Sequence, residues 1–266
     1  MRKYWQIFKI NWDSVLVYRF NVLLWRVRMM LSFLTIYFFW GAVFSEYSQI
    51  ADYSSASLLA YLVVAFFLQT LVFANDSFRI TAEIATGDLN NYLLKPMGYL
   101  SQWLARDWSL KVLNLMCFMV EITALTLIFK LPVFFLTDWR RWLVFLAASV
   151  LAALLYFFFS FLVSSFSFWY PEHNGWPLRF LMLMFLDFLS GTAFPLDIFP
   201  QSLAALFKIL PTTYFIFFPA QIYLGRLNPG EIVQGFLIMA VWLTVFIFLA
   251  KKAWQKGLQI YGAYGR

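Results

Sequence analysis

Residues 142–170 read WLVFLAASVLAALLYFFFSFLVSSFSFWY and contain no charged side chain. A transmembrane helix needs about 20 apolar residues, so this run is long enough to cross a bilayer. The rest of the chain has the same character, because 63% of its 266 residues are hydrophobic and 12% are charged. Soluble domains average about 45–50% apolar and about 25% charged residues. The composition therefore excludes an ordinary soluble domain and predicts a protein embedded in lipid.

Further apolar runs predict more membrane-spanning helices. They cover residues 29–45, 53–75, 112–129, 180–194 and 232–250. Together with residues 142–170 they predict an all-α integral membrane protein with six transmembrane helices. We expect a single transmembrane domain over residues 1–266.

The region between the fifth and sixth predicted spans, residues 195–230, is apolar but interrupted by proline. Four prolines lie between residues 195 and 219: Pro195, Pro200, Pro211 and Pro219. Proline inside a helix removes a hydrogen bond and clashes with the preceding turn, so we expect short broken helices. Such backbone is tolerated at membrane depth only where it packs against protein or lines a cavity. The region is therefore predicted to be an outer re-entrant helical element and not a seventh span.

The basic residues give the orientation. Six spans place both termini on one side of the membrane. Of the 20 Lys and Arg residues, only these then fall on the opposite side: Lys130, Arg140, Arg141, Lys208 and Arg226. The positive-inside rule predicts cytoplasmic termini in a multi-pass protein of the cell membrane. The net charge of +7 follows from this topology, so we expect lipid and not nucleic acid around the chain.

Residues 1–28 are predicted to form an interfacial helix. Trp5, Phe8 and Trp12 recur at helical spacing, with Arg2 and Lys9 on the other face. Basic residues opposite aromatic ones suit a helix that lies in the membrane interface. The alternative is that this stretch is only the charged flank of the first span.

Residues that usually carry catalysis are scarce. The only histidine, His173, lies in PEHNG at residues 171–175, which is typical of a polar turn between spans. The only cysteine, Cys117, excludes an intrachain disulfide and a cysteine metal cluster. No Gly-x-x-x-x-Gly-Lys-Ser/Thr loop is present, so the chain is not expected to hold ATP by that route. We expect neither a cofactor in this chain nor an enzymatic activity of its own.

Two carboxylates, Glu121 and Asp187, lie inside predicted spans. An intramembrane carboxylate is costly and marks a transport path, a proton relay or a paired contact. For Glu121 the path and the structural contact are equally supported. For Asp187 a structural role is favoured, because Ser190 and Thr192 offer nearby hydrogen-bond partners. Lys111, near the end of its span, is expected to extend its amine toward the interface.

The predicted cytoplasmic loop, residues 76–106, contains a compact element. A short helix is expected to end at Thr86, because Gly87 suits a helix C-cap. A second helical turn then begins at Leu89 and is stopped by Pro96. Such an element suits docking to a cytosolic partner, and an amphipathic loop on lipid headgroups is an equally good interpretation.

Two motifs in this order resemble those of a known family. Residues 83–89 read EIATGDL and residues 93–96 read LLKP, which is similar to the cytoplasmic loop of ABC-2 type permeases. Residues 190–200 read SGTAFPLDIFP, which is similar to the outer segment between the last two spans of that family. The resemblance covers nearly the whole chain, and the nearest branch is that of bacterial permeases encoded beside a separate ATPase, often in pairs.

This resemblance implies a division of labour. The permease would carry the translocation path of an ABC exporter, and a separate nucleotide-binding subunit would hold ATP and magnesium. A second permease, identical or paralogous, would complete the path. The implied ATPase-coupling residues are Glu83, Thr86, Gly87, Asp88 and Leu89. The implied lid over the path contains Gly191, Pro195, Pro200 and Pro211. The chain departs from the family at Ile84, where other members often have a basic residue after the glutamate.

Other functions remain open from the sequence. A proton-coupled secondary transporter would use Glu121 or Asp187, but it predicts inverted repeats, which the sequence does not contain. An intramembrane enzyme would need a nucleophile with a base, and His173 is the simplest candidate for that base. A purely structural subunit would anchor an ATPase without forming a path.

Overall fold

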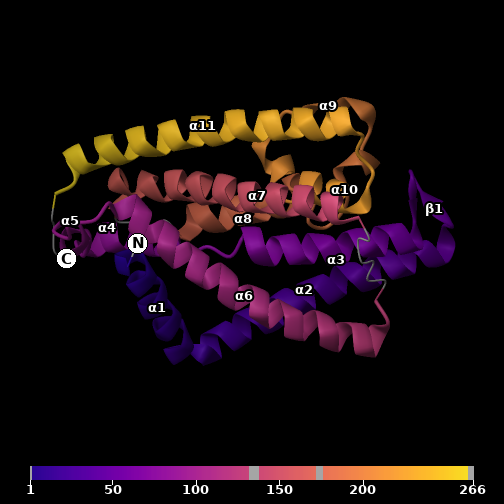
Figure 1. Ribbon diagram of the computed structural model, residues 1–266, viewed down its shortest axis with the longest axis horizontal. Helices are drawn as coiled ribbons and strands as arrows, with labels where there is room; N and C mark the ends of the chain where they lie inside the picture. The colour runs from indigo at the N-terminus through magenta and orange to yellow at the C-terminus, as the bar shows by residue number, and fades with distance from the viewer. Residues whose placement is uncertain (1, 132–137, 172–175, 263–266) are drawn as a thin grey trace.

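The computed structural model describes residues 2–131, 138–171 and 176–262, and its long helices run side by side along one direction (Figure 1). Five of the described helices are long and apolar enough to cross a membrane. They are α2 (Arg19–Glu46), α3 (Ser55–Val72), α6 (Tyr99–Phe129), α7 (Trp139–Ser165) and α11 (Pro229–Ile260). The prediction of an all-α membrane protein is therefore confirmed.

Helices α2 and α6 run in one direction and α3, α7 and α11 run in the opposite direction, so the bundle has two distinct ends (Figure 1). One end, called here the α4 end, carries α1 (Arg2–Val17), α4 (Phe78–Thr86), α5 (Leu89–Leu93) and the end of α11. The other, called the hairpin end, carries the antiparallel strands β1 (Gln49–Ile50) and β2 (Tyr53–Ser54). Both ends of the described chain thus lie together, as the sequence predicts.

Helix α3 lies at the centre of the bundle. About two-thirds of its apolar window is buried, against 11% of the window in α2. Small side chains such as Ala65 on α3 and Ala148 and Ala152 on α7 are fully buried there, which suits close helix packing in lipid. Helices α2, α6 and α11 instead turn many apolar side chains outward, where lipid or another subunit can cover them.

Several helix ends differ from the sequence-based expectation. Residues 19–28 belong to α2 and not to the N-terminal helix, which breaks at Tyr18. Helix α6 begins at Tyr99, well before the predicted residue 112, and α11 runs ten residues beyond the predicted residue 250, to Ile260. The predicted spans end where charged residues interrupt the apolar runs. The helices continue past these positions, because Lys, Arg and Glu are good helix formers.

The fifth predicted span also differs. Helix α8 covers Trp176–Leu189, which is 14 residues, and ends five residues before the expected boundary at 194. At 1.5 Å per residue it is about 21 Å long, shorter than the hydrocarbon core of about 30 Å. The helix stops because Gly191 adopts a positive φ of 83°, which no α-helical residue has.

The proline-containing region after α8 consists of short helices, as expected. They are η3 (Leu196–Ile198), α9 (Gln201–Phe207), η4 (Pro211–Tyr214) and α10 (Phe217–Leu224). This outer segment, residues 190–226, reaches β2 at two points: the Tyr53 hydroxyl contacts both Asp197 and Gln221. Between these points, the Phe215 ring lies 6.3 Å from that of Phe73, just after α3. The segment therefore contacts both β2 and the residue that follows α3.

Candidate functional site

Helices α4 and α5 form a compact element at the α4 end of the bundle (Figure 1). Helix α4 ends at Thr86, and Gly87 follows with a φ of 82°. This left-handed position strongly favours glycine, which accounts for the residue type there. Helix α5 covers Leu89–Leu93 and stops before Pro96. The predicted helix end, its glycine cap and the second turn are all confirmed.

The element has its own small core. Ile80, Ile84 and Leu89 are buried against aromatic side chains of three other helices, Trp103 of α6, Phe161 of α7 and Trp254 of α11. The Trp254 ring stacks on that of Tyr99, with 4.4 Å between the ring centroids. This core holds the two short helices at a fixed position on the bundle.

The coupling residues expected from the resemblance divide into two groups. Thr86 and Asp88 are exposed, and the Thr86 hydroxyl donates to the Asp88 carboxylate at 2.8 Å. Glu83 and Leu89 are buried, so the surface of the element is formed by other residues. Leu94, which is 85% exposed, is its most prominent apolar side chain.

Glu83 fastens α4 to α6. Its carboxylate accepts hydrogen bonds from the Tyr99 hydroxyl at 2.5 Å and from Arg106 Nη1 at 3.3 Å. Burial raises the pKa of Glu83, while the Tyr99 hydroxyl and the Arg106 charge act in the opposite direction. The basic partner of this glutamate thus comes from α6, and position 84 holds a buried isoleucine.

The elbow between α3 and α4, residues 73–77, is held by side chains from other helices. Lys111 of α6 donates to the carbonyl oxygens of Val72 at 3.2 Å and Ala74 at 2.6 Å, and pairs with Asp107 at 3.2 Å. The last carbonyls of a helix lack intrahelical partners and favour a cation. Lys111 is therefore fully buried, and the expectation that it extends to the interface is wrong.

A second set of contacts holds the elbow from α7 and α8. Arg179 Nη1 donates to the Ser77 hydroxyl at 2.8 Å, and the Ser164 hydroxyl donates to the Ser77 carbonyl at 2.9 Å. Asp76 pairs with Arg79 at 2.7 Å, and burial raises the pKa of Asp76 to about 6 despite that cation. No local sequence pattern indicates this role for Arg179, because its partner Ser77 is 102 residues away.

Glu121 is paired across the bundle. The Arg26 guanidinium contacts both carboxylate oxygens, through Nε at 2.7 Å and through Nη2. Arg26 Nη1 also donates to Asn114 at 3.3 Å, and the arginine is 4% exposed. Glu121 therefore has, in Arg26, the partner that the structural interpretation requires.

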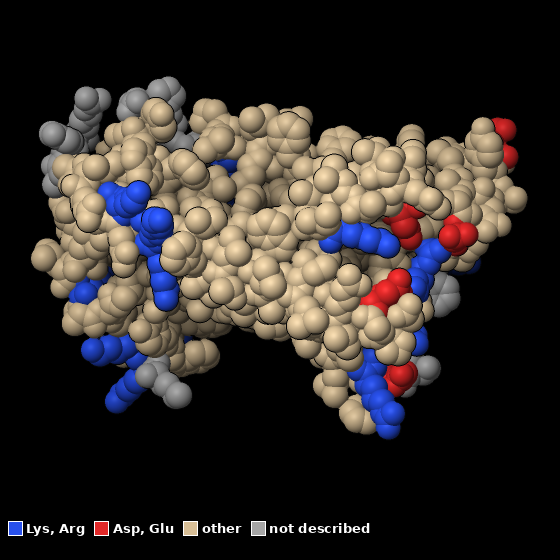
Figure 2. All heavy atoms as spheres, turned by 90° about the horizontal axis from the view of Figure 1, so that it is seen from above, with Lys and Arg blue, Asp and Glu red and all other residues tan. Residues whose placement is uncertain are grey.

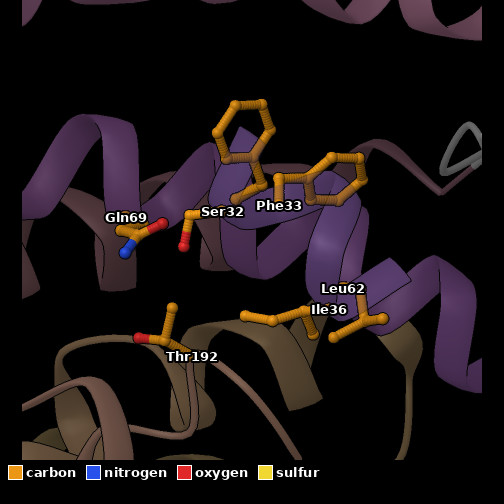
Figure 3. A pocket seen from close by; sticks show the side chains of 7 residues that line it. Ser32, Phe33, Ile36, Leu62, Gln69 and Thr192 are labelled. Atoms are coloured by element: carbon orange, nitrogen blue, oxygen red, sulfur yellow. The ribbon is translucent and has the colours of Figure 1, made fainter. Parts of the chain in front are cut away.

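Asp187 contacts Gln69, which lines a recess between α2, α3 and the outer segment (Figure 3). Its carboxylate accepts a 3.4 Å hydrogen bond from Gln69, and the expected partners Ser190 and Thr192 instead bond to each other. Figure 3 shows polar side chains toward one end of the recess and apolar ones toward the other. The lining residues are Ser32, Gln69, Thr192, Phe33, Ile36, Leu62 and Phe66.

The expected lid residues lie within the outer segment. The Gly191 carbonyl accepts a 2.5 Å hydrogen bond from the Tyr61 hydroxyl of α3. Pro195 and Pro200 directly precede η3 and α9, and Pro211 is the first residue of η4. Proline suits the start of a helix, where the missing N–H has no partner to lose.

A charged cluster at the hairpin end ties the outer segment to β2 and was not predicted. The Asp197 carboxylate accepts from the Tyr53 hydroxyl at 2.9 Å and from Gln221 at 3.2 Å, and the Arg226 guanidinium lies 3.7 Å from the centre of the Tyr53 ring. On the face seen in Figure 2, both signs of charge occur at this end, whereas the α4 end shows only basic side chains.

Among the described residues, no three histidine, cysteine or carboxylate side chains form a group that could hold a metal ion. His173 lies outside the described residues. The protein is therefore an all-α membrane bundle. The compact α4–α5 element lies at one end, and the outer segment reaches the hairpin end.

A family model described as ABC-2 family transporter protein matches residues 30–265. The chain therefore belongs to this family and is the membrane subunit, or permease, of an ABC transporter. No curated protein matches the chain.

Proposed function

We propose that this permease belongs to an ATP-driven exporter and receives its movement from a separate ATPase subunit, which holds ATP and magnesium. The observation that carries the proposal is the α4–α5 element. It has its own core, it is anchored by Glu83, and it exposes Thr86, Asp88 and Leu94. Leu93 and Leu94 are consecutive and both exposed, and neighbouring exposed apolar side chains suit a protein interface.

The membrane orientation follows from charge. Basic side chains gather at the α4 end, so this end and both termini face the cytoplasm of the cell membrane. Helix α8 and the start of the outer segment together form the fifth span in chain order, which brings the number of crossings to six. The remainder of the outer segment is re-entrant, supported by the contacts of Phe215 with Phe73 inside the bundle and of Gln221 with Tyr53 at the hairpin end.

The mechanism is alternating access between two permeases. Closure of the ATPase subunits on ATP displaces α4, and the core beneath α4 passes that displacement to α6, α7 and α11. The path then opens outward as the lid, which includes Gly191, Pro195, Pro200 and Pro211, yields. The energy comes from the difference in nucleotide affinity between the two states. An amphipathic or hydrophobic cargo suits walls that are rich in Phe and poor in charge.

Co-purification tests this function. The chain is expressed with the ATPase encoded beside it, extracted in mild detergent and weighed as a complex. We expect a stoichiometric ATPase that is lost with Leu94→Asp and retained with Leu94→Met, which keeps an apolar side chain. The same mass measurement separates one permease species from two.

Absence of the ATPase from both the wild-type and Leu94→Met preparations would refute the proposal. A proton-coupled transporter would then be the alternative, with Asp187 tested before Glu121, because Glu121 is held in an ion pair with Arg26. Uncoupler-sensitive transport without ATP would support that alternative.

A further inference from the structure

We propose that Arg179 is a positioning residue that holds the first turn of α8 to Ser77, the residue directly before α4. A displacement of α4 is then transmitted along α8 to the outer segment. This inference rests on the proposed function, because it requires an ATPase that moves α4.

The first step is the position of Arg179. It lies in the first turn of α8, and its guanidinium contacts the Ser77 hydroxyl at 2.8 Å, the Ser160 hydroxyl at 3.3 Å and the Asn75 carbonyl at 3.4 Å. Ser77 immediately precedes α4. The arginine is 6% exposed, so these contacts are shielded from solvent and are stronger than they would be at a surface. Arg179 therefore binds Ser77, the residue that directly precedes α4.

The second step is the weak attachment of the rest of α8. Most of its large apolar side chains are about half exposed and do not lock into the bundle: Leu178, Phe180, Leu181, Met184, Phe185 and Phe188. A further polar tie from the helix is the long 3.4 Å hydrogen bond between Asp187 and Gln69. Leu186, which is 3% exposed, packs into the main core, so α8 is held along one narrow face and at its two ends. We expect such a helix to move with the group that holds its first turn.

The third step is the junction at the far end of α8. The Ser190 carbonyl accepts a 3.0 Å hydrogen bond from the Phe217 amide, at the start of α10. Helix α8 is thus connected to Ser77, before α4, at one end and to the outer segment at the other. Lys111 holds the same elbow to α6, which packs along α1 and α3.

The experiment measures movement and not stability alone. Spin labels are placed on Ser48→Cys beside β1 and Ser202→Cys on α9, both exposed, in a Cys117→Ser background. The permease is reconstituted in nanodiscs with its bound ATPase, and the distance between the labels is measured without nucleotide and with ATP and vanadate. We expect a nucleotide-dependent change of distance in the otherwise unaltered chain.

Arg179→Gln is expected to abolish that change while the ATPase stays bound and hydrolyses ATP at its basal rate. Arg179→Lys keeps the charge and should restore part of the change. Ser77→Ala removes one acceptor with little loss of volume and should reduce the change, which keeps the test informative if Arg179→Gln fails to fold.

Two results would overturn the inference with the proposed function intact: a bound ATPase with no distance change in the unaltered chain, or a full change in Arg179→Gln or Ser77→Ala. Failure of the ATPase to bind the unaltered chain would instead overturn the proposed function itself, and the inference with it.

Discussion

The Arg26 guanidinium and the Glu121 carboxylate lie side by side between α2 and α6, and each carboxylate oxygen accepts from a different guanidinium nitrogen. Bidentate pairing of this kind fixes geometry as well as charge. Helices α2 and α6 pack little against each other elsewhere, so the pair is a main tie between them.

Removing one partner of this pair should be costly, because it leaves a buried charge uncompensated. We expect Glu121→Gln to lower the free energy of unfolding by about 3 kcal/mol, measured by thermal or denaturant unfolding in detergent. The double exchange Arg26→Glu with Glu121→Arg should recover part of the loss. Unchanged stability in Glu121→Gln would show that the pair contributes nothing and would return Glu121 to the candidates for the path.

The hydrogen bond between Tyr99 and Glu83 should hold α4 in place. We expect Tyr99→Phe to cost about 1–3 kcal/mol, because the buried carboxylate loses its shorter hydrogen bond. Hydrogen exchange at the amides of residues 78–86 should accelerate, while exchange in α3 stays unchanged. Tyr47→Phe is the control, because Tyr47 is exposed and directly follows α2 at the hairpin end, away from α4. Equal exchange in Tyr99→Phe and the unaltered chain would contradict this anchor.

The elbow should respond to pH through Asp76. Its pKa is raised to about 6 in the folded protein from an ordinary value of 3.8, so the folded state binds the proton more tightly between these pH values. Stability from this group is therefore highest in acid and falls as pH rises toward 6 and above. We expect Asp76→Asn to melt at the same temperature as the unaltered chain near pH 4 and at a higher temperature at pH 7.

The difference in free energy of unfolding between Asp76→Asn and the unaltered chain at pH 7 is at most about 3 kcal/mol, because the pKa of Asp76 is raised by about two units. Melting curves of both proteins between pH 4 and pH 8 measure it. A constant difference across this range would show that Asp76 does not titrate there.

Gly191 should tolerate no side chain. Its φ is 83°, and a Cβ added there would lie 2.7 Å from the Tyr61 hydroxyl and 3.0 Å from Phe217 Cβ. We expect Gly191→Ala to lower the melting temperature and weaken the Tyr61 contact, at a cost of about 1–3 kcal/mol from backbone strain. Gly41→Ala on α2 is the control, because no atom lies within 4 Å of its added Cβ. Similar melting of the two variants would argue against the strained turn.

Local signals predicted the parts of this protein that depend on local chemistry. Gly87 marks the end of α4 because only a residue tolerant of positive φ fits there, and the prolines of residues 195–230 mark short helices because they cannot continue one. Long-range pairing left no local pattern. Lys111 and Arg179 look like ordinary basic residues at the ends of spans, and their burial follows from carbonyls and hydroxyls supplied by the distant elbow.

The surface of the α4–α5 element shows the same limit. The sequence places Glu83 and Leu89 in a motif but does not say which side faces inward. Only the packing of Trp103, Phe161 and Trp254 decides that Leu89 is covered and Leu94 is free. The choice of mutations for a docking test therefore depends on the fold.

The stacking of Trp254 on Tyr99 also has a consequence for biosynthesis. Helix α4 is made early in translation, but one wall of its core belongs to α11, near the far end of the chain. A nascent permease therefore cannot close that core until α11 has left the ribosome and entered the membrane. Cytosolic subunits that require a rigid α4 would then ignore truncated chains and assemble only with finished ones.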